Sequence, residues 1–333
     1  MKNKNGPIVL ICFVFLLFLL IGSFIHYKKT LSQPISEGDE QVTIVIEEGQ
    51  SVKSILNSLV EEGLLKNLHA YYVKIYLKLN KLESKLQAGT YQLPKQLTIV
   101  ELVEALQSGR DLDIWVLIPE GLRKDEIADI IKKEFDGNNL QDFSREEFLQ
   151  LTENREYINT LDLVIEVDNL EGFLFPDRYA FPKDATAETV IEKMISNFKT
   201  KVGEEYTYEE IIFASIVERE GYNANDRPII AGIILKRYSE GWLLQTDATL
   251  LYPVKNWKHT ITIQDKEDDN PYNTYKRLGL PPTPICNPGL QSIEAVWKPQ
   301  ESSYYFYIHD KEKNPHFADT LDEHGKNIEK YLR

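Results

Sequence analysis

Glu218 is the side chain whose surroundings in the sequence best suit acid-base chemistry. It lies near the end of the mostly apolar run 209–220, a pattern that predicts a helix buried on most sides. Ala214 and Ser215 precede it by four and three residues, so the three side chains share one helix face. Two small residues beside a carboxyl group would leave room for a substrate oxygen. A carboxyl group partly withdrawn from water can keep a proton near neutral pH, as a general acid must.

A plainer interpretation of Glu218 is a structural one. A glutamate at a helix end can be solvated, or it can pair with a neighbouring arginine such as Arg219 or Arg227. The helix alone therefore does not decide between catalysis and an ion pair, and the segments around it matter.

Several other segments contain more proline, amide, hydroxyl and aromatic side chains than a core requires. Loops stiffened by proline lose little entropy when they hold a ligand, and these polar groups suit the hydroxyls of a sugar. The segments are 171–179, 244–249, 270–275, 279–285 and 287–289. Each of them could be a simple structural turn, but their joint occurrence with one buried acid favours a cleft for a carbohydrate.

Other chemistries find less support in the sequence. The C-terminal histidines and acids match no zinc motif: His309, Asp310, His316, Asp319 and His324. There is no Gly-x-Ser-x-Gly motif for a serine hydrolase. The two cysteines, Cys12 and Cys286, offer neither a plausible disulfide nor a cysteine-ligated zinc site. We therefore expect no metal and no cofactor.

Composition limits the class of partner. The chain has 333 residues, of which 42% are hydrophobic and 27% charged, as in a globular protein of about two domains. It carries 52 acidic and 38 basic side chains, a formal net charge of −14. Binding of a phosphate backbone needs a basic footprint, so nucleic acid is not expected as a partner.

The N-terminus predicts a membrane anchor. Residues 8–25 contain no charge and are long enough, as a helix, to cross a hydrocarbon core. No small-residue cleavage signal follows them, because His26, Tyr27 and two lysines come next. We expect 1–7 to be a cytoplasmic tail, 8–25 a transmembrane helix and 26–40 a linker to an exported body. A buried hydrophobic helix is the alternative.

Residues 41–112 have the pattern of a small α+β module. Alternating apolar residues predict a strand at 41–46, and Ser51 is placed to cap a following helix. A second helix at 68–79, a strand at 88–93 and a helix capped by Thr98 complete it.

Residues 113–333 read as a larger mixed α+β domain. Its start, 117–121, repeats the strand-turn pattern of 45–49, with an isoleucine six residues beyond the glycine in both. Helices are predicted at 145–151, 186–198, 208–220 and 227–239. The last third is expected to be mostly short strands and loops, with a strand at 304–308 and a helical end at 328–332.

Taken in order, these motifs resemble those of the MltG (YceG-like) endolytic murein transglycosylases. The matching segments are 170–177, 214–220, 244–247, 272–275, 279–282 and 287–289, together with Ala88-Gly89-Thr90-Tyr91 in the N-terminal module. The resemblance covers nearly the whole chain. It implies a LysM-like subdomain at 41–112 and a transglycosylase catalytic domain at 113–333.

The resemblance also implies an activity. Such enzymes cut the β-1,4 bond between N-acetylmuramic acid and N-acetylglucosamine without water, and one glutamate, here Glu218, acts first as acid and then as base. No second acid is obvious beside Glu218, since Glu220 should point elsewhere and Asp247 is at most an auxiliary residue. By analogy of position, the substrate-binding residues would be Ser215, Gln245, Thr246, Asp247, Asn273, Tyr275 and Asn287.

Partners and alternatives follow from the same resemblance. The expected partners are peptidoglycan strands and membrane-bound peptidoglycan synthases, with nascent strands cut close to the membrane. The segment 255–269 departs from the family pattern, and its role is open. A non-catalytic wall-binding scaffold and a hydrolytic muramidase are the alternative functions.

Overall fold

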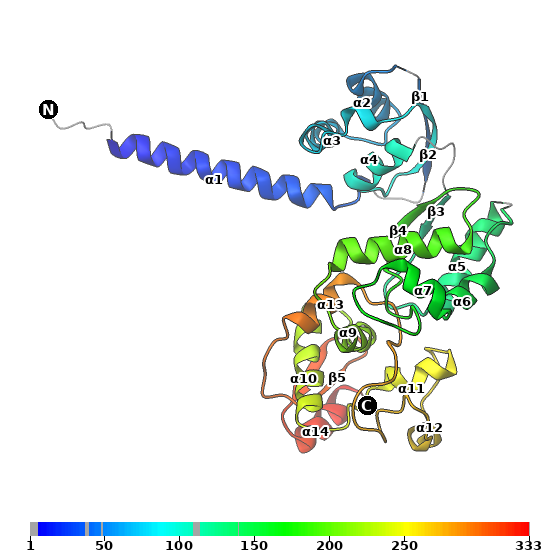
Figure 1. Ribbon diagram of the computed structural model, residues 1–333. Coiled ribbons are helices and arrows are strands. Elements are labelled where there is room, and N and C mark those ends of the chain that lie inside the picture. Colours follow the sequence, from blue (N-terminus) through cyan, green and yellow to red (C-terminus); the bar gives the residue numbers. More distant parts are fainter. Residues whose placement is uncertain (1–5, 37–39, 48, 109–113, 139, 333) are drawn as a thin grey trace. The chain divides into compact units, whose positions relative to one another are not determined.

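The computed structural model describes the backbone of residues 6–36, 40–47, 49–108, 114–138 and 140–332, and their side chains except 6–16 and 20. The chain forms two compact units, Met1–Trp115 and Val116–Arg333 (Figure 1). The domain boundary expected after residue 112 lies outside the described residues. The mixed α+β class is confirmed, since helices combine with three two-stranded sheets in the described part of the chain.

The first unit is the α+β module that the sequence predicts. Strands β1 (Gln41–Ile46) and β2 (Gly89–Pro94) are antiparallel, with Gln41 opposite Pro94 and Ile46 opposite Gly89. The unit's other elements are α2 (Val52–Glu61), α3 (Asn67–Leu79), the short 3₁₀ helix at Glu83–Lys85 and α4 (Ile99–Ser108). The predicted caps are present: Ser51 Oγ accepts from Ser54 N, and Thr98 Oγ1 accepts from Glu101 N.

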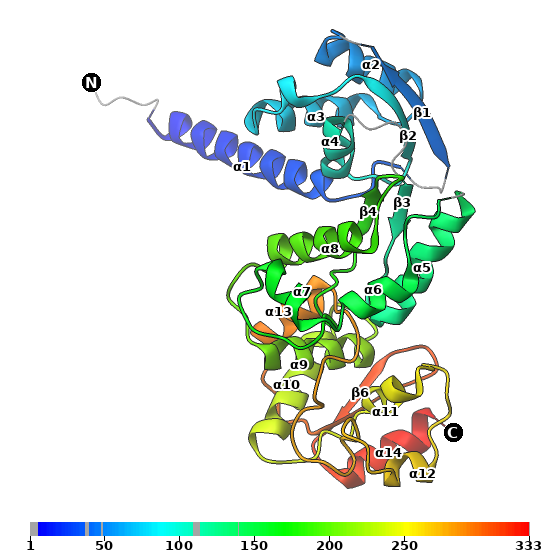
Figure 2. The same ribbon diagram turned by 45° about the vertical axis from the view of Figure 1, so that its right-hand side comes forward.

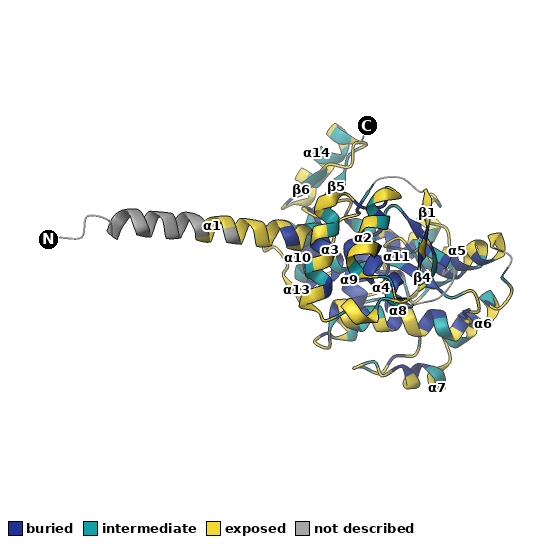
Figure 3. Cartoon of the chain, turned by 90° about the horizontal axis from the view of Figure 1, so that it is seen from above, coloured by how far each residue is buried: buried dark blue, intermediate teal, exposed yellow. Residues whose placement is uncertain are grey.

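Helix α1 (Gly6–Leu31) continues into the segment that was expected to be a linker. Its described residues are mostly exposed as far as His26 (Figure 3), but Tyr27, Leu31 and Ile35 are buried in the core of the first unit. These three residues pack against the core because burial removes their apolar side chains from water. In the described part of the chain, no helix combines the length and the apolar character that a membrane crossing requires. The expected anchor 8–25 is described only in part, because the side chains of residues 8–16 and of residue 20 lie outside the described residues.

The second unit opens with a small sheet and a group of helices (Figure 2). The sheet pairs β3 (Ile114–Leu117), whose first two residues are the last of the first unit, with β4 (Arg178–Phe181). Between the strands come α5 (Lys124–Gly137), α6 (Arg145–Leu151), α7 (Arg155–Ile158) and a 3₁₀ turn at Asn159–Leu161. Helix α8 (Ala187–Val202) follows, and the predicted turn glycine Gly121 has φ +78°, matching Gly49 at φ +79° in the first unit.

The rest of the second unit surrounds α9 (Tyr208–Glu220). Helix α9 packs against α10 (Arg227–Ser239) and α13 (Leu290–Trp297), as predicted for a helix buried on most sides. The remaining elements are α11 (Asp247–Val254), α12 (Ile263–Glu267), the hairpin β5 (Phe306–His309) with β6 (Pro315–Ala318), and α14 (Leu321–Tyr331). Strands and loops do make up most of residues 240–332, but the sequence did not predict α11, α12 and α13, because these helices are too short for a clear helical period to show.

Candidate active site

Glu218 is held by three hydrogen-bond donors from two other segments. Its side chain is 5% exposed. Oε1 accepts from Arg227 Nη2 at 2.9 Å, and Oε2 accepts from Gly289 N at 3.0 Å and from Ser292 Oγ at 2.7 Å. The pairing with Arg227 is the structural alternative foreseen from the sequence. It occurs together with contacts to Gly289 and Ser292 at the start of α13, so the carboxylate is buried among polar donors rather than exposed to bulk water.

Arg227 connects Glu218 to two further side chains. Its Nη1 donates to Gln291 Oε1 at 2.8 Å, and its Nη2 lies 3.6 Å from Glu120 Oε2. The approach of α10 to the end of α9 needs Gly221, since a Cβ there would lie 2.6 Å from Arg227 Cγ. The α9–α10 turn therefore fixes both members of the Glu218–Arg227 pair.

Glu120 is a second acid at this site. It follows β3, and burial together with the Glu218 charge raises its pKa, while Arg227 lowers it. The expectation that Glu218 has no acidic neighbour is wrong, because both carboxylates lie within 3.6 Å of the same Arg227 nitrogen. The only sequence feature that pointed to Glu120 was the repeated strand-turn pattern at 117–121. That pattern predicts a turn but does not indicate which residues the turn contacts.

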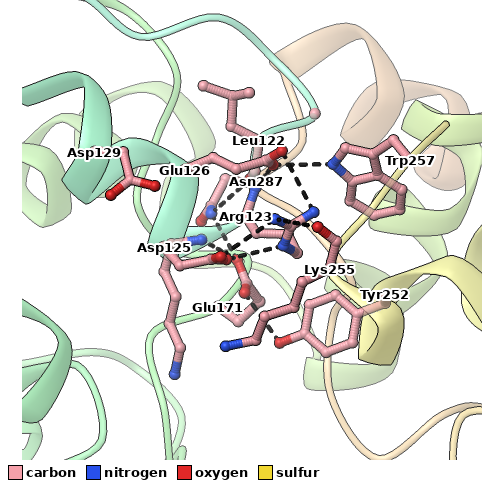
Figure 4. A network of polar contacts seen from close by, with 12 residues as sticks. Leu122, Arg123, Asp125, Glu126, Asp129, Glu171, Tyr252, Lys255, Trp257 and Asn287 are labelled. Atoms are coloured by element: carbon pink, nitrogen blue, oxygen red, sulfur yellow. Dashed lines mark hydrogen bonds and ion pairs between the residues drawn. The ribbon is translucent and has the colours of Figure 1, made fainter. Parts of the chain in front are cut away.

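Asn287 is buried and bonded on both ends of its amide (Figure 4). Its Oδ1 accepts from Gly172 N and Leu174 N, each at 2.9 Å. Its Nδ2 donates to Leu122 O at 3.0 Å and to Glu171 Oε1 at 2.8 Å. The side chain expected to grip a sugar thus joins three segments of the protein in this structure.

Glu171 is the buried acid at the centre of this network (Figure 4). Oε1 also accepts from Lys124 N at 3.0 Å, and Oε2 accepts from Tyr252 OH at 3.0 Å. Burial is the main cause that raises the pKa of Glu171 to about 7. The network ties the start of α5 to α11 and to the loop before α13.

Trp257, in the segment 255–269, lies beside Arg123 and Glu126 (Figure 4). The guanidinium carbon of Arg219 lies 3.9 Å from the centroid of the Trp257 ring, and that of Arg123 lies 5.1 Å from it. Trp257 Nε1 donates to Glu126 Oε2 at 2.9 Å. The ring therefore holds the guanidinium of Arg219, the residue that follows Glu218.

Ser215 and Ala214 have no exposed surface. Ser215 Oγ accepts from Ile285 N at 3.0 Å, and the carbonyl of Ser215 accepts from Cys286 Sγ at 3.3 Å. The room beside these small residues is occupied by the loop before α13. The structure places Ser215 in the core rather than at a surface that a substrate could reach.

Thr246 and Asn273 are also buried, and both bind neighbouring loops. Thr246 N donates to Thr274 Oγ1 at 3.1 Å. Asn273 Nδ2 donates to three carbonyls within 265–268, and its Oδ1 accepts from Tyr275 N at 2.9 Å. These two residues shape the loops that carry their more exposed neighbours.

Gln245, Asp247 and Tyr275 reach solvent, and the charge of Glu220 acts on Asp247 and Tyr275. Gln245 has φ +53°, a strained backbone for a residue other than glycine. Tyr275 OH donates to Asp247 Oδ1 at 2.6 Å. Burial is the main cause that raises the pKa of Tyr275, and the charges of Asp247 and Glu220 raise it further. Burial is the main cause that raises the pKa of Glu220 to about 7, and its Oε2 accepts from Tyr307 OH at 3.0 Å.

Two of the C-terminal histidines, His309 and His316, pair with carboxylates. His316 Nε2 lies 3.0 Å from Asp310 Oδ2, and His309 Nε2 lies 3.3 Å from Asp226 Oδ2. Within the described ranges, no three or more His, Cys, Asp or Glu side chains are grouped so as to hold a metal ion.

Comparison with known proteins decides the family. The model of the YceG-like family matches residues 44–330, most of both units. The chain belongs to the YceG-like family. This YceG-like chain is 32% identical to an endolytic murein transglycosylase of Bacillus subtilis, over 94% of this chain and 91% of that protein.

Two further relatives support the same family. The YceG-like chain is 28% identical to an endolytic murein transglycosylase of Streptococcus pneumoniae, over 96% of this chain and 64% of the longer pneumococcal protein. It also resembles the crystal structure of a protein described as yceG-like from Listeria monocytogenes. That likeness has a TM-score of 0.58 and 29% identity, over 87% of this chain and 99% of the Listeria chain.

Proposed function

We propose that this protein is an endolytic lytic transglycosylase of peptidoglycan. It cleaves the β-1,4 bond between N-acetylmuramic acid and N-acetylglucosamine inside glycan strands and leaves 1,6-anhydro ends. Relatives that align with more than nine tenths of this chain are named endolytic murein transglycosylases. The observation that carries the proposal at the site is the Glu218 carboxyl group, which is 5% exposed and held by three donors, one at the start of α10 and two at the start of α13.

Glu218 performs both proton transfers in this reaction. It donates a proton to the glycosidic oxygen while the bond to C1 of the muramic acid breaks and its electron pair passes to that oxygen. The C6 hydroxyl oxygen of the same sugar then bonds to C1, and its proton returns to Glu218. Arg227, Gly289 N–H and Ser292 stabilise the carboxylate between the two steps, because hydrogen bonds to a charged group are the strong ones.

The residues expected to bind substrate fall into two groups, those whose side chains reach solvent and those that are buried. Gln245, Asp247 and Tyr275 reach solvent and contact the glycan strand in our proposal. The buried residues Ser215, Thr246, Asn273 and Asn287 support the binding loops from behind.

The placement of the enzyme is part of the proposal. The uncharged run 8–25 anchors the chain in the cell membrane as a single span, with the catalytic domain outside the cytoplasm. Unit one, with its strand-helix-helix-strand order, serves as a LysM-like module. Membrane-bound peptidoglycan synthases, which supply nascent strands, are the partners.

Product analysis tests the function. The full chain is incubated with purified glycan strands in ¹⁸O-labelled water, and the new ends are identified by mass spectrometry. Anhydro ends without ¹⁸O are expected. Reducing ends that carry ¹⁸O would identify a hydrolytic muramidase, and binding without cleavage would identify a scaffold.

A further inference from the structure

Two carboxylates share one guanidinium at the start of α10. Arg227 Nη2 lies 2.9 Å from Glu218 Oε1 and 3.6 Å from Glu120 Oε2. The side chains of Arg227 and Glu218 are 11% and 5% exposed, whereas that of Glu120 is 44% exposed. One positive charge therefore serves two acids, and the more accessible acid is the one for which the proposed mechanism has no role.

The backbone around Glu120 allows its carboxylate to come close to the loop that binds Glu218. Gly289, whose N–H binds Glu218 Oε2, has no side chain, and a Cβ on it would overlap Glu120 Oε1. The turn that carries Glu120 is held to the same loop, since Gly121 N donates to Asn287 O at 2.9 Å. The position of the Glu120 carboxylate is therefore set by the backbone of the turn and of the loop before α13.

The charges around Glu218 come from several segments. They are Arg227 on α10, Arg219 on α9 and Glu120 after β3. Cys286 before α13 adds no charge, because burial raises the pKa of its thiol well above the ordinary value. Arg219 is turned toward the carbonyl of Gly121 and the ring of Trp257. Repulsion between Glu218 and Glu120 acts on both groups, so an ionised Glu120 weakens the hold of Arg227 on Glu218.

We propose that Glu120 is a positioning residue of the catalytic centre, which divides the charge of Arg227 and so lets Glu218 release and regain its proton. The proposal rests on the proposed function in one respect, that Glu218 is the proton donor. Without Glu120, Arg227 would act on Glu218 alone. Glu218 would then lose its proton at lower pH, and protonation of the substrate would fail first on the alkaline side.

The pH profile of Glu120→Gln tests the proposal. We expect the alkaline limb of kcat/KM to move down by about one pH unit, which makes the variant about tenfold slower on that limb. On the acid side, its activity stays near that of the wild type. Glu204→Gln, which removes the same charge from an exposed loop residue, should leave the profile unchanged. An equal loss at every pH, or an unmoved alkaline limb, would overturn the proposal.

A second measurement needs no turnover. In the full chain labelled with [¹³C]glutamate and kept in detergent, the Glu218 carboxyl signal is identified by its loss in Glu218→Gln. Its titration midpoint should fall by about one pH unit in Glu120→Gln. An unchanged midpoint would contradict the charge sharing. If the glycan products were hydrolytic instead of anhydro-ended, the proposed function would fail while this shift remained, because hydrolysis needs the same proton.

Discussion

Glu218 and Glu220 lie two residues apart on α9, but different partners bind them. Successive residues of a helix are rotated by about 100°, so these two side chains leave the helix in nearly opposite directions. Glu218 meets Arg227, Gly289 and Ser292, whereas Glu220 meets Tyr307. One turn of helix thus carries two acids into two different polar environments, which makes the pair a natural test of the assigned acid.

Glu218→Gln should abolish most of the activity and keep the fold. The amide cannot transfer the proton, so turnover should fall by roughly 10³-fold or more. The free energy of unfolding should fall by only about 1–3 kcal/mol, because the amide nitrogen would face one of the donors from which the carboxylate accepts a hydrogen bond. Rates of anhydro-end formation and urea unfolding measure the two effects.

Glu220→Gln is the matched control on the same helix, and it should keep more than about a tenth of the wild-type rate, since the proposed mechanism gives Glu220 no proton to transfer. If this variant were the inactive one and Glu218→Gln stayed active, the proton donor would be Glu220.

Sequence alone could place Glu218 but not its neighbours. The apolar run shows the helix, and a helix shows which residues share its face. Glu120 is 98 residues earlier in the chain, and its contact with Arg227 depends on how β3 and α10 pack. The small residues Ala214 and Ser215 do leave room beside the helix, but the loop with Ile285 occupies that room.

At the scale of elements, Asn287 joins the turn after β3, the start of the 171–174 segment and the loop before α13. Asn287→Asp would replace the Nδ2 donor by an oxygen that faces Leu122 O and the Glu171 carboxylate. We expect a loss of about 3–5 kcal/mol in the free energy of unfolding, as for a buried charge without a partner. Urea unfolding at pH 7 measures it.

Asn225→Asp provides the control, because it makes the same atomic change at an exposed position. A second change tests the mechanism: Glu171→Gln supplies a donor to the carboxylate that Asn287→Asp introduces, so the double variant should recover part of the loss. A loss below about 1 kcal/mol in Asn287→Asp would mean that this amide does not join the segments.

Glu171 predicts how the stability of the second unit depends on pH. Burial raises its pKa in the folded chain to about 7, from an ordinary value of 4.5. The folded chain therefore holds this proton more tightly than the unfolded chain does. Its stabilising effect is complete below pH 4.5 and is lost as the pH rises through about 7.

Comparison with Glu171→Gln isolates this effect. Between about pH 5 and pH 8, the free energy of unfolding of the wild type should fall by a few kcal/mol relative to the variant, since one pKa unit corresponds to about 1.4 kcal/mol. Urea unfolding at both pH values gives the difference, with Glu204→Gln as a surface control. A difference that is constant with pH would exclude Glu171 as the titrating group.

At the scale of the whole molecule, the chain forms two compact units, and the buried residues of the first unit form a hydrophobic core cluster. The strand-helix-helix-strand order of unit one could be predicted because each element has a cap or a clear period, as at Ser51 and Thr98. The burial of the end of α1 could not be predicted from the sequence. Lysines and polar residues at 28–34 resemble a linker, and only packing shows that Tyr27, Leu31 and Ile35 belong to the core.

The buried end of α1 leads to a prediction about truncated chains. A chain of residues 41–333 lacks Tyr27, Leu31 and Ile35, and also the hydrogen bond from Ile35 N to Leu97 O at 2.8 Å. Each fully buried apolar side chain contributes roughly 1.5–3 kcal/mol, so unit one should be several kcal/mol less stable than in a chain of residues 26–333. Thermal unfolding, followed by tyrosine fluorescence and by calorimetry, measures this. In the 41–333 chain the transition of unit one should lie at a lower temperature, and the transition of unit two should not move.

Two point variants of the 26–333 chain separate packing from length. Leu31→Ala should reproduce part of the loss, whereas Ser32→Ala, next to it but exposed, should not. If 26–333 and 41–333 unfolded alike, residues 26–40 would be the simple tether that their composition suggests. If only the longer chain keeps the stable first unit, the end of α1 is a structural part of the module that follows it.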